Sequence, residues 1–273
     1  MSLTTMDGVI AALIPVPTVW GKDALTAKAA GIPHTPWYGT GLLGAGGAPS
    51  GGLNGATWTG PSLSGQIPVP AAVAGATSAL VRASINAAAN VGGCWLIDRQ
   101  WGNVPVVTTT TSQPITSPTW VPRDASASTA GAGVYLALEC SATTGNVGAI
   151  TNTTVGYTNS AGVAGRTATL ASFPATAPTG TWVMFALQAG DVGVRSVQSI
   201  TLGTSYVSGQ VNLMAFRVVC DTPPNPAAGV SNLLSMTQLG LPRVWDASVL
   251  QLVYFPTGTA VGAASGSLTF AQG

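Results

Sequence analysis

Carboxylates and histidine carry most general acid–base chemistry in proteins, and this sequence has few of them. Hydrolysis of a glycosidic bond needs two carboxyl groups facing one cleft about 5–10 Å apart, and the acids that could form such a pair are Asp98, Asp124, Glu139 and Asp191. His34 is the only histidine, so a Ser-His-Asp or Cys-His centre would have to use it. It lies in a proline-flanked segment, where an ordinary loop histidine is the simpler interpretation.

Most of the acids have a cation close by in the sequence. The pairs are Lys22–Asp23, Asp98–Arg99, Arg123–Asp124, Asp191–Arg195, Arg217–Asp221 and Arg243–Asp246. Because an arginine fork can hold a carboxylate and nearby carbonyls in fixed geometry, such pairs at strand ends indicate structural ion pairs. Glu139 has no such neighbour, and the alternation around it lets it either face outward or pair inward with a distant arginine. The sequence therefore predicts a protein that is not an enzyme, with structural ion pairs at Arg123, Asp124, Asp191, Arg195, Arg243, Asp246 and Glu139.

Residues 39–44 match the G-x-G-x-x-G spacing of a dinucleotide-binding turn. Such a turn needs a buried strand before it, a helix after it and an acidic residue about 20 positions later. Here glycines and prolines flank the motif, and no acid occurs between Asp23 and Asp98. The cysteines lie far apart in apolar runs, at Cys94, Cys140 and Cys220. This favours buried free thiols, and the alternative is one disulfide with one thiol left over or a link between subunits. No cofactor and no metal site is predicted.

The overall charge argues against two further classes of partner. Nine Lys or Arg and eight Asp or Glu make up 6% of 273 residues, and the formal net charge is +1, whereas a soluble domain usually has roughly 25% charged residues. Without a basic run, we expect no binding to nucleic acid. Gly, Pro, Asn or Thr interrupts the apolar stretches, and the first cation is Lys22, so we expect neither a membrane span nor an export signal.

So few charges are unusual for a soluble protein, whose surface normally carries many. One explanation is that part of the surface is buried in a larger assembly, because exposed apolar area marks interaction sites. The other is a surface made polar by Thr, Ser, Asn and Gln, in which the chain is also rich. The assembly is the favoured explanation.

Residues 1–65 differ from the rest of the chain. The segment 31–65 is rich in Gly and Pro and has no sustained periodicity, which predicts an extended N-terminal arm or irregular loop. Trp20, Trp37 and Trp58 fall in this region, and large aromatics in an extended arm suggest anchors that insert into a neighbouring surface. The alternative is that they fold back over the core of this same chain.

From residue 66 the apolar residues alternate with polar ones, as half-buried strands require. Strands are expected at 77–86, 94–97, 104–110, 133–141, 147–158, 163–170, 181–188, 196–203, 209–220, 249–255 and 267–271. Hairpins are expected at Gly92-Gly93 and at 159–162, although an Ala-rich helix competes over 71–90. This pattern predicts an all-β fold, a two-sheet β-sandwich of jelly-roll type. It would form a single domain over 66–273, with 221–273 contributing the final strands.

Several stretches between residues 94 and 273 are similar to a group of virion-associated proteins of tailed bacteriophages. They are 95–101, 121–124, 131–134, 155–159, 165–167, 190–200 and 241–246. The resemblance implies a structural protein of the virion, assembled in the host cytoplasm. It implies a capsid decoration (cement) protein or head-fibre component that contacts the major capsid protein or other virion proteins and self-associates, commonly as a homotrimer.

Two alternatives stay open. A receptor- or glycan-binding module of a tail or head fibre would use exposed aromatics such as Trp101 or Trp120 as stacking platforms for sugars. A polysaccharide depolymerase would need an acid pair such as Glu139 and Asp98.

Overall fold

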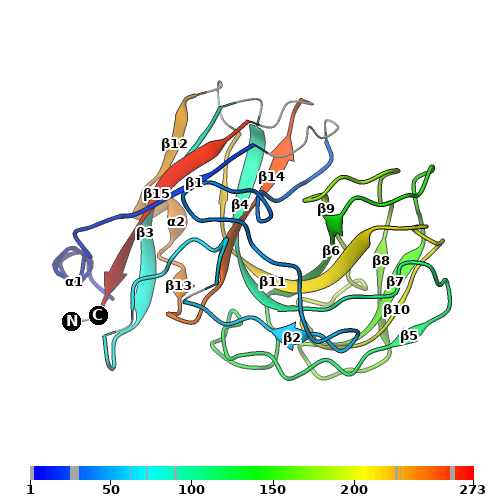
Figure 1. Ribbon diagram of the computed structural model, residues 1–273. Helices are drawn as coiled ribbons and strands as arrows, with labels where there is room; N and C mark the ends of the chain where they lie inside the picture. The colour runs from blue at the N-terminus through cyan, green and yellow to red at the C-terminus, as the bar shows by residue number, and fades with distance from the viewer. Residues whose placement is uncertain are drawn as a thin grey trace.

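The protein is all-β, as predicted, with antiparallel sheets and two short helices. The computed structural model describes residues 3–24, 31–61, 63–71, 73–88, 91–224, 227, 229–258 and 262–273. Within these residues the strands form three sheets, named A, B and C, which follow one another from left to right in Figure 1. The packing is that of a β-sandwich, but the described sheets number three where two were predicted, and the jelly-roll topology is not supported.

Sheet A has the strand order β1-β15-β3-β12, with β13 paired to β3. Its strands are β1 (Thr18–Lys22), β3 (Ser78–Ala87), β12 (Ser231–Leu234), β13 (Arg243–Val244) and β15 (Ala264–Gln272). On β3, Ala83, Ile85 and Ala87 are buried and alternate with less buried residues, as the predicted strand requires. β1 is an edge strand, and it was not among the predicted strands.

Sheet B has the order β14-β4-β11-β6-β9, with β2 paired to β4. Its strands are β2 (Ala56–Thr57), β4 (Val91–Gly102), β6 (Val134–Ala142), β9 (Trp182–Met184), β11 (Gln210–Thr222) and β14 (Leu250–Pro256). The hairpin predicted at Gly92-Gly93 is wrong, because β3 pairs in sheet A and β4 pairs with β11 and β14 in sheet B. The chain changes sheet at this point instead of reversing within one.

Sheet C has the order β5-β10-β7-β8, with β5 (Gln113–Pro114), β7 (Thr153–Asn159), β8 (Arg166–Leu170) and β10 (Val194–Thr201). Its β7–β8 pair confirms the second predicted hairpin, with Thr153 opposite Leu170 and Tyr157 opposite Arg166. The turn is closed by the Gly162 amide, which donates to the Asn159 carbonyl at 2.9 Å. The strand predicted at 104–110 is absent, since this segment forms turns.

Sheet B lies between the other two and shares a core with each. Against sheet A, Leu96, Leu250 and Leu252 pack with residues such as Leu80 and Leu268. Against sheet C, Leu136, Leu138 and Leu213 pack with Val155, Tyr157 and Ile200, among others. A third cluster on sheet B contains Ile97, Met214 and Phe216, which alternate along their strands with residues of the other two cores. The final strands β14 and β15 belong to sheets B and A, so the C-terminal segment completes sheets that earlier segments begin.

The two helices are short and lie beside sheet A. Helix α1 (Met6–Ala11) begins at Thr5, whose hydroxyl accepts a hydrogen bond from the Gly8 amide at 3.1 Å. Val9 and Ala12 pack against Val81 of β3 and Ala271 of β15. Helix α2 (Met236–Leu239) ends at a glycine with a left-handed backbone.

The prediction of an extended arm at residues 1–65 does not describe this structure. Residues 18–22 form β1 and pair with β15, while β2 pairs with β4. His34 forms backbone bridges to Thr181 and to Tyr254, so the chain there spans from β14 to the region of β9. The Gly/Pro composition removes regular secondary structure, and hydrogen bonds and tryptophan packing then fix the segment onto this chain's own sheets.

Candidate functional site

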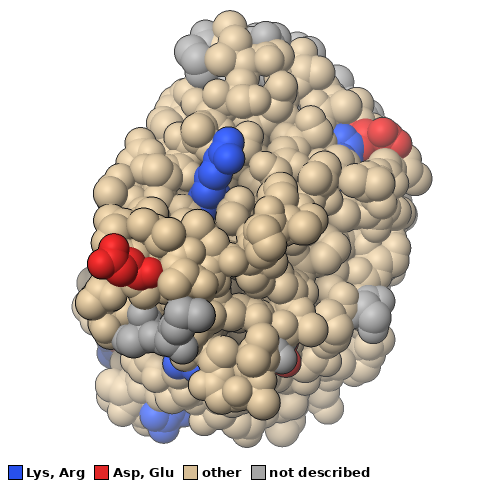
Figure 2. All heavy atoms as spheres, turned by 90° about the vertical axis from the view of Figure 1, so that its left-hand side faces the viewer, with Lys and Arg blue, Asp and Glu red and all other residues tan. Residues whose placement is uncertain are grey.

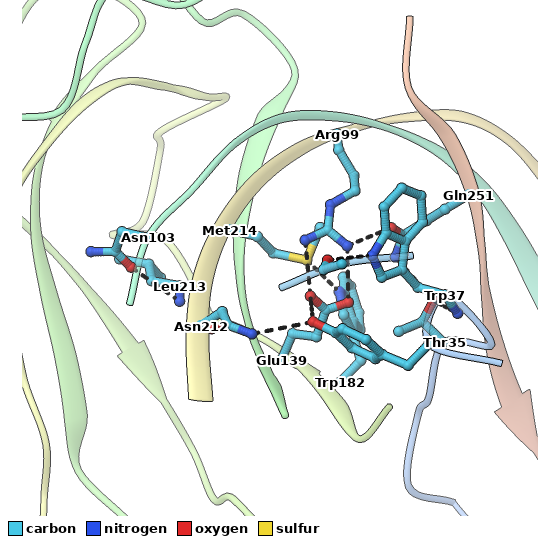
Figure 3. A network of polar contacts seen from close by, with 12 residues as sticks. Thr35, Trp37, Arg99, Asn103, Glu139, Trp182, Asn212, Leu213, Met214 and Gln251 are labelled. Carbon is cyan, nitrogen blue, oxygen red and sulfur yellow. Dashed lines mark hydrogen bonds and ion pairs between the residues drawn. The ribbon is translucent and has the colours of Figure 1, made fainter. Parts of the chain in front are cut away.

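A buried ion pair joins sheet B to the N-terminal segment. The Arg99 guanidinium on β4 contacts the Glu139 carboxylate on β6 with both of its terminal nitrogens, at 2.9 and 3.1 Å. Both side chains are fully buried, and Arg99 also donates to Gln251 Oε1 at 2.7 Å (Figure 3). Of the two interpretations of Glu139, the structure has the inward pair with a distant arginine.

Two of the three predicted anchors pack on this ion pair. The Arg99 guanidinium lies 4.8 Å from the ring centre of Trp37 and 4.6 Å from that of Trp58, within the range of cation–π attraction. The Tyr38 hydroxyl donates to Glu139 Oε2 at 3.0 Å, and burial raises the pKa of Tyr38 well above its ordinary value. Trp20 and Trp37 are buried inside this chain and Trp58 is half-buried, so the tryptophans hold the segment to its own core.

Lys22 supports the same segment from β1. Its ammonium donates to the carbonyls of Trp37, Gly39 and Gly44 at 3.1, 3.0 and 2.5 Å. Burial lowers the pKa of Lys22 to about 8, and neighbouring Asp23 opposes that shift. One lysine therefore binds three backbone carbonyls of a segment that has no regular secondary structure.

A second buried charge centre is built on Asp98, next to Arg99 in β4. The Asp98 carboxylate lies 3.4 Å from Arg123 Nε and 3.8 Å from an Arg217 nitrogen. It also accepts hydrogen bonds from the Ser248 hydroxyl at 2.8 Å and the Val249 amide at 2.9 Å. The Asp98 carboxylate is thus enclosed by two arginines and two hydrogen-bond donors, with no exposed side-chain surface.

Arg123 connects the two centres through backbone carbonyls. It donates to the carbonyls of Arg99 at 2.8 Å, Trp58 at 2.7 Å and Ala247. Five of the charged residues, Asp98, Arg99, Arg123, Glu139 and Arg217, are thus gathered in the interior. The polar network of Figure 3 is a structural joint between the N-terminal segment and sheet B.

None of the six ion pairs predicted between neighbours in the sequence is formed in the described part of the structure. Arg123 pairs with Asp98, and Asp191 pairs with Arg166 at 2.9 Å. Arg243 stacks on Trp245, 5.1 Å from its ring centre, and makes no ion pair with Asp246. Alternation accounts for Asp98 and Arg99, which are adjacent in β4 and so point to opposite faces. Asp124, Asp191 and Asp246 lie in loops outside the strands, where nearness in the sequence does not decide the partner.

Asp124 organises a loop. Its carboxylate accepts hydrogen bonds from the amides of Ser126, Ser128, Gly131 and Ala132 at 2.6–3.1 Å, and from the Ser128 hydroxyl at 2.7 Å. Burial by itself would raise the pKa of Asp124, but these hydrogen bonds lower it below its ordinary value. The charge of Asp124 is therefore used to hold the loop 124–132 in one shape.

Asp191 closes the β7–β8 hairpin. It accepts hydrogen bonds from Arg166 at 2.9 and 3.0 Å, from the Tyr157 hydroxyl at 2.5 Å and from Asn159 at 2.7 Å. Hydrogen bonds from Arg166 and then Tyr157 hold the pKa of Asp191 well below its ordinary value, whereas burial and Asp191 raise that of Tyr157 to about 12. Arg195, the cation predicted for this carboxylate, is not part of the cluster.

The arginine partners of Asp191 and Glu139 were not predicted from the sequence, for different reasons. Arg166 could have been found, because the predicted hairpin places it opposite Tyr157. Arg99 had been assigned to neighbouring Asp98, and its contact with Glu139 passes across the intervening strand β11. No local signal in the sequence points to that contact.

The surface has open grooves, whereas the cysteine side chains are buried in the interior. Within the described residues, a groove of about 380 Å³ is lined by Trp58, Thr57 and Ser64 among others, and one of about 410 Å³ is lined by Arg195 and several hydroxyl side chains. All three cysteines lie within the described residues and are buried, and none of them forms a disulfide. No group of three or more possible metal ligands occurs in the part of the chain that the structure describes. No helix among the described residues is long and apolar enough to cross a membrane.

Comparisons with known proteins provide no family for the chain. No family model matches it, and no curated protein sequence matches it. Among solved structures, it is similar to the T=1 particles derived from infectious bursal virus, with a TM-score of 0.16 and 9% identity over 95% of this chain and 78% of that chain. A VP2 subviral particle of infectious bursal disease virus has a TM-score of 0.17 and 9% identity over 95% of this chain and 81% of that one. Similarities at TM-scores this low carry no argument about fold or function.

Proposed function

We propose that the protein is a non-enzymatic structural component of a tailed-bacteriophage virion, a capsid decoration (cement) protein that binds and stabilises the head shell. The distribution of charge is the observation that carries the proposal. Seven of the charged residues, Lys22, Asp98, Arg99, Arg123, Asp124, Glu139 and Arg217, are buried. Lys28 lies outside the described residues, and of the nine other charged residues Asp191 has a side chain that is only 3% exposed, which leaves eight to charge the described surface.

The outer surface is consequently poor in charge and carries exposed apolar side chains. Figure 2, which looks onto the sheet A side, shows a few charged residues, two of opposite sign side by side, among wide uncharged areas. Fourteen large hydrophobic residues are exposed among the described residues. A surface of this kind is poorly suited to a free monomer, and burying it against other subunits removes the cost of exposing it.

One apolar strip stands out at the edge of sheet A. Met6, Ile10, Leu13, Val16 and Val19 are all exposed and follow one another in the sequence, from α1 through the residues that connect it to β1. The strip ends on an edge strand, which offers backbone groups to which a further strand can be added. This apolar strip is the surface that would contact the neighbouring virion subunit, most simply the major capsid protein.

Self-association belongs to the same proposal. Decoration proteins act in many copies and stabilise a shell by mass action. A closed homotrimer would bury part of the uncharged surface and present three apolar strips to a local threefold axis of the shell.

Copy number in purified particles tests the proposal. Quantitative mass spectrometry, with isotope-labelled peptides of this chain and of the major capsid protein as standards, should find hundreds of copies per particle. A handful of copies would instead indicate a fibre or tail component. Absence from particles washed at moderate salt would overturn the virion assignment.

The alternative function, a receptor- or glycan-binding module, would need Trp101 and Trp120 exposed for stacking on sugars. Trp101 and Trp120 are fully or almost fully buried, and their indole nitrogens donate to the carbonyls of Asn54 at 3.0 Å and Val194 at 2.7 Å. Neither ring can stack on a sugar from solution. The acid pair required by a depolymerase is likewise occupied, because Glu139 and Asp98 are both engaged in the buried ion pairs.

A further inference from the structure

A groove lies at the sheet C end of the molecule, between the start of β10 and two loops. It is about 410 Å³ in volume and is lined by Ser117, Pro118, Thr119, Ser128, Thr129, Ala130, Arg195 and Ser196. Ligand pockets in proteins commonly span about 300–1,000 Å³. The groove is thus large enough for one sugar ring, and none of its lining residues belongs to the ion-pair joint.

Arg195 is the charged residue of the groove, and no carboxylate neutralises it. Its sequence neighbour Asp191 is occupied by Arg166, and no acidic oxygen of the described residues lies within 4.0 Å of the Arg195 guanidinium. One terminal nitrogen donates to the Ser160 carbonyl at 3.3 Å. A guanidinium has five N–H donors in a fixed fork, so most of them remain available to a ligand.

The hydroxyl groups around Arg195 are arranged to donate. Ser117 Oγ accepts a hydrogen bond from the Val197 amide at 2.9 Å, and Ser196 Oγ accepts one from Gln198 at 2.8 Å. Because a hydroxyl has one proton as well as two lone pairs, both keep an O–H to offer. Thr119 and Thr129 are exposed, and no hydrogen bond joins either hydroxyl to another described residue. The groove therefore presents a cation and hydroxyl donors to whatever enters it.

The walls of the groove are held in place before any ligand binds. Asp124 fixes the loop that carries Ser128 and Ala130 with its five hydrogen bonds, and those bonds occupy its own oxygens. That loop is seated tightly on β10, because a Cβ at Gly131 would lie 1.9 Å from the Val194 carbonyl oxygen. A preformed site loses little conformational freedom on binding.

From these observations we infer that the groove at Arg195 binds an acidic saccharide through its carboxylate or phosphate group. Arg195 would pair with the anionic oxygens, as arginine forks do with carboxylates and phosphates. The serine and threonine hydroxyls would bond to the sugar hydroxyls, and Pro118 and Ala130 would cover its C–H face. This site lies at the opposite end of the molecule from the apolar strip (Figure 1), so a protein docked through sheet A would present the groove outward.

Titration of the full-length protein with small probes tests this site independently of any particle. By NMR or calorimetry, glucuronate and glucose 6-phosphate should bind, and glucose should bind at least tenfold more weakly, since a charge-assisted hydrogen bond is lost. Titration with inorganic phosphate shows whether the groove recognises the whole sugar or only its anionic group. If it binds as tightly as the sugar phosphate, the groove is a simple anion site and the saccharide assignment is wrong.

Substitutions of groove residues test whether glucuronate binds in the groove. Arg195→Ala should weaken glucuronate binding at least tenfold and Arg195→Lys less, while Arg82→Ala, at an exposed arginine of sheet A, should leave it unchanged. A double Thr119→Val and Thr129→Val variant should also bind more weakly, with an unchanged unfolding midpoint. Equal binding by wild type and Arg195→Ala would overturn the inference, whatever the copy number on the particle.

Discussion

The two carboxylate–arginine pairs differ most clearly in where they lie. Arg99 and Glu139 are wholly buried beneath Trp37 and Trp58, whereas the Arg166 side chain of the Arg166–Asp191 pair is 24% exposed at the end of a hairpin. The first pair ties together segments distant in sequence, and the second closes a turn between neighbouring strands. The comparison shows that this chain uses seven of its few charged side chains to fix its interior, which leaves the outer surface poor in charge.

Breaking the buried pair should have the largest effect. Glu139→Ala leaves the Arg99 guanidinium buried without its counter-ion, and such a change typically costs about 3–5 kcal/mol of unfolding free energy. Urea unfolding followed by tryptophan fluorescence measures it, because Trp37 and Trp58 lie against Arg99. A loss below about 1 kcal/mol would mean that the joint is not essential, since a cost that small is typical of exposed ion pairs.

Removing the Lys22 ammonium should have an intermediate effect. Lys22→Met keeps most of the buried apolar chain but leaves three carbonyls without their donor, which should cost about 1–3 kcal/mol. Hydrogen exchange should show faster exchange in residues 37–46 while the β7–β8 hairpin stays protected. Uniform loss of protection across the molecule would contradict a local role for Lys22.

Breaking the Arg166–Asp191 ion pair should lower the free energy of unfolding less, and the size of the loss should depend on pH. Because the pKa of Asp191 is depressed in the folded state, its stabilisation is present above the ordinary carboxyl value near 3.9 and is lost as the pH falls through the folded pKa. Asp191→Asn should therefore be less stable than wild type at pH 7, by less than Glu139→Ala, and the difference should shrink below about pH 4. A difference that stays constant from pH 7 to pH 3 would show that the charge of Asp191 does not contribute.

Changes on the apolar strip should barely affect folding. Val16→Ser with Val19→Ser removes exposed methyl groups, so the unfolding free energy should change by no more than about 0.5 kcal/mol. Sedimentation equilibrium should nevertheless show weaker binding to shells or to other copies. The control is Val147→Ser with Val207→Ser, at two exposed valines outside the strip. If the control weakens binding equally, the strip has no special role.

The sequence predicted much of the fold from two patterns. The strand around residues 78–87 and the β7–β8 hairpin show period-2 alternation, whereas the strands around 134–142 and 250–256 are short apolar runs buried at most positions. The short strands β1, β2, β5, β12 and β13 were missed, since two to five residues are too few to show a period. Their places are decided by pairing with strands distant in the chain.

The ion-pair partners could be predicted only where local geometry decides them. Proximity in sequence suggested Arg195 for Asp191 and Asp124 for Arg123, but Asp191 pairs with Arg166 of β8 and Arg123 pairs with Asp98 of β4. Residues 31–65 looked like a separate arm because Gly and Pro remove periodicity. The contacts that hold this segment down join residues far apart in the sequence, such as Tyr38 and Glu139 at 101 positions and Thr35 and Gln251 at 216.

The central claim is that the weakly charged surface around sheet A is an interface in the virion. Cryo-electron microscopy of particles with and without this protein tests it most directly, through a difference map. Density should appear at regular positions over the whole head shell, with α1 and β1 against the capsid and sheet C facing outward. Density confined to the tail, or shell density in which the Met6–Val19 strip faces solvent, would contradict the account.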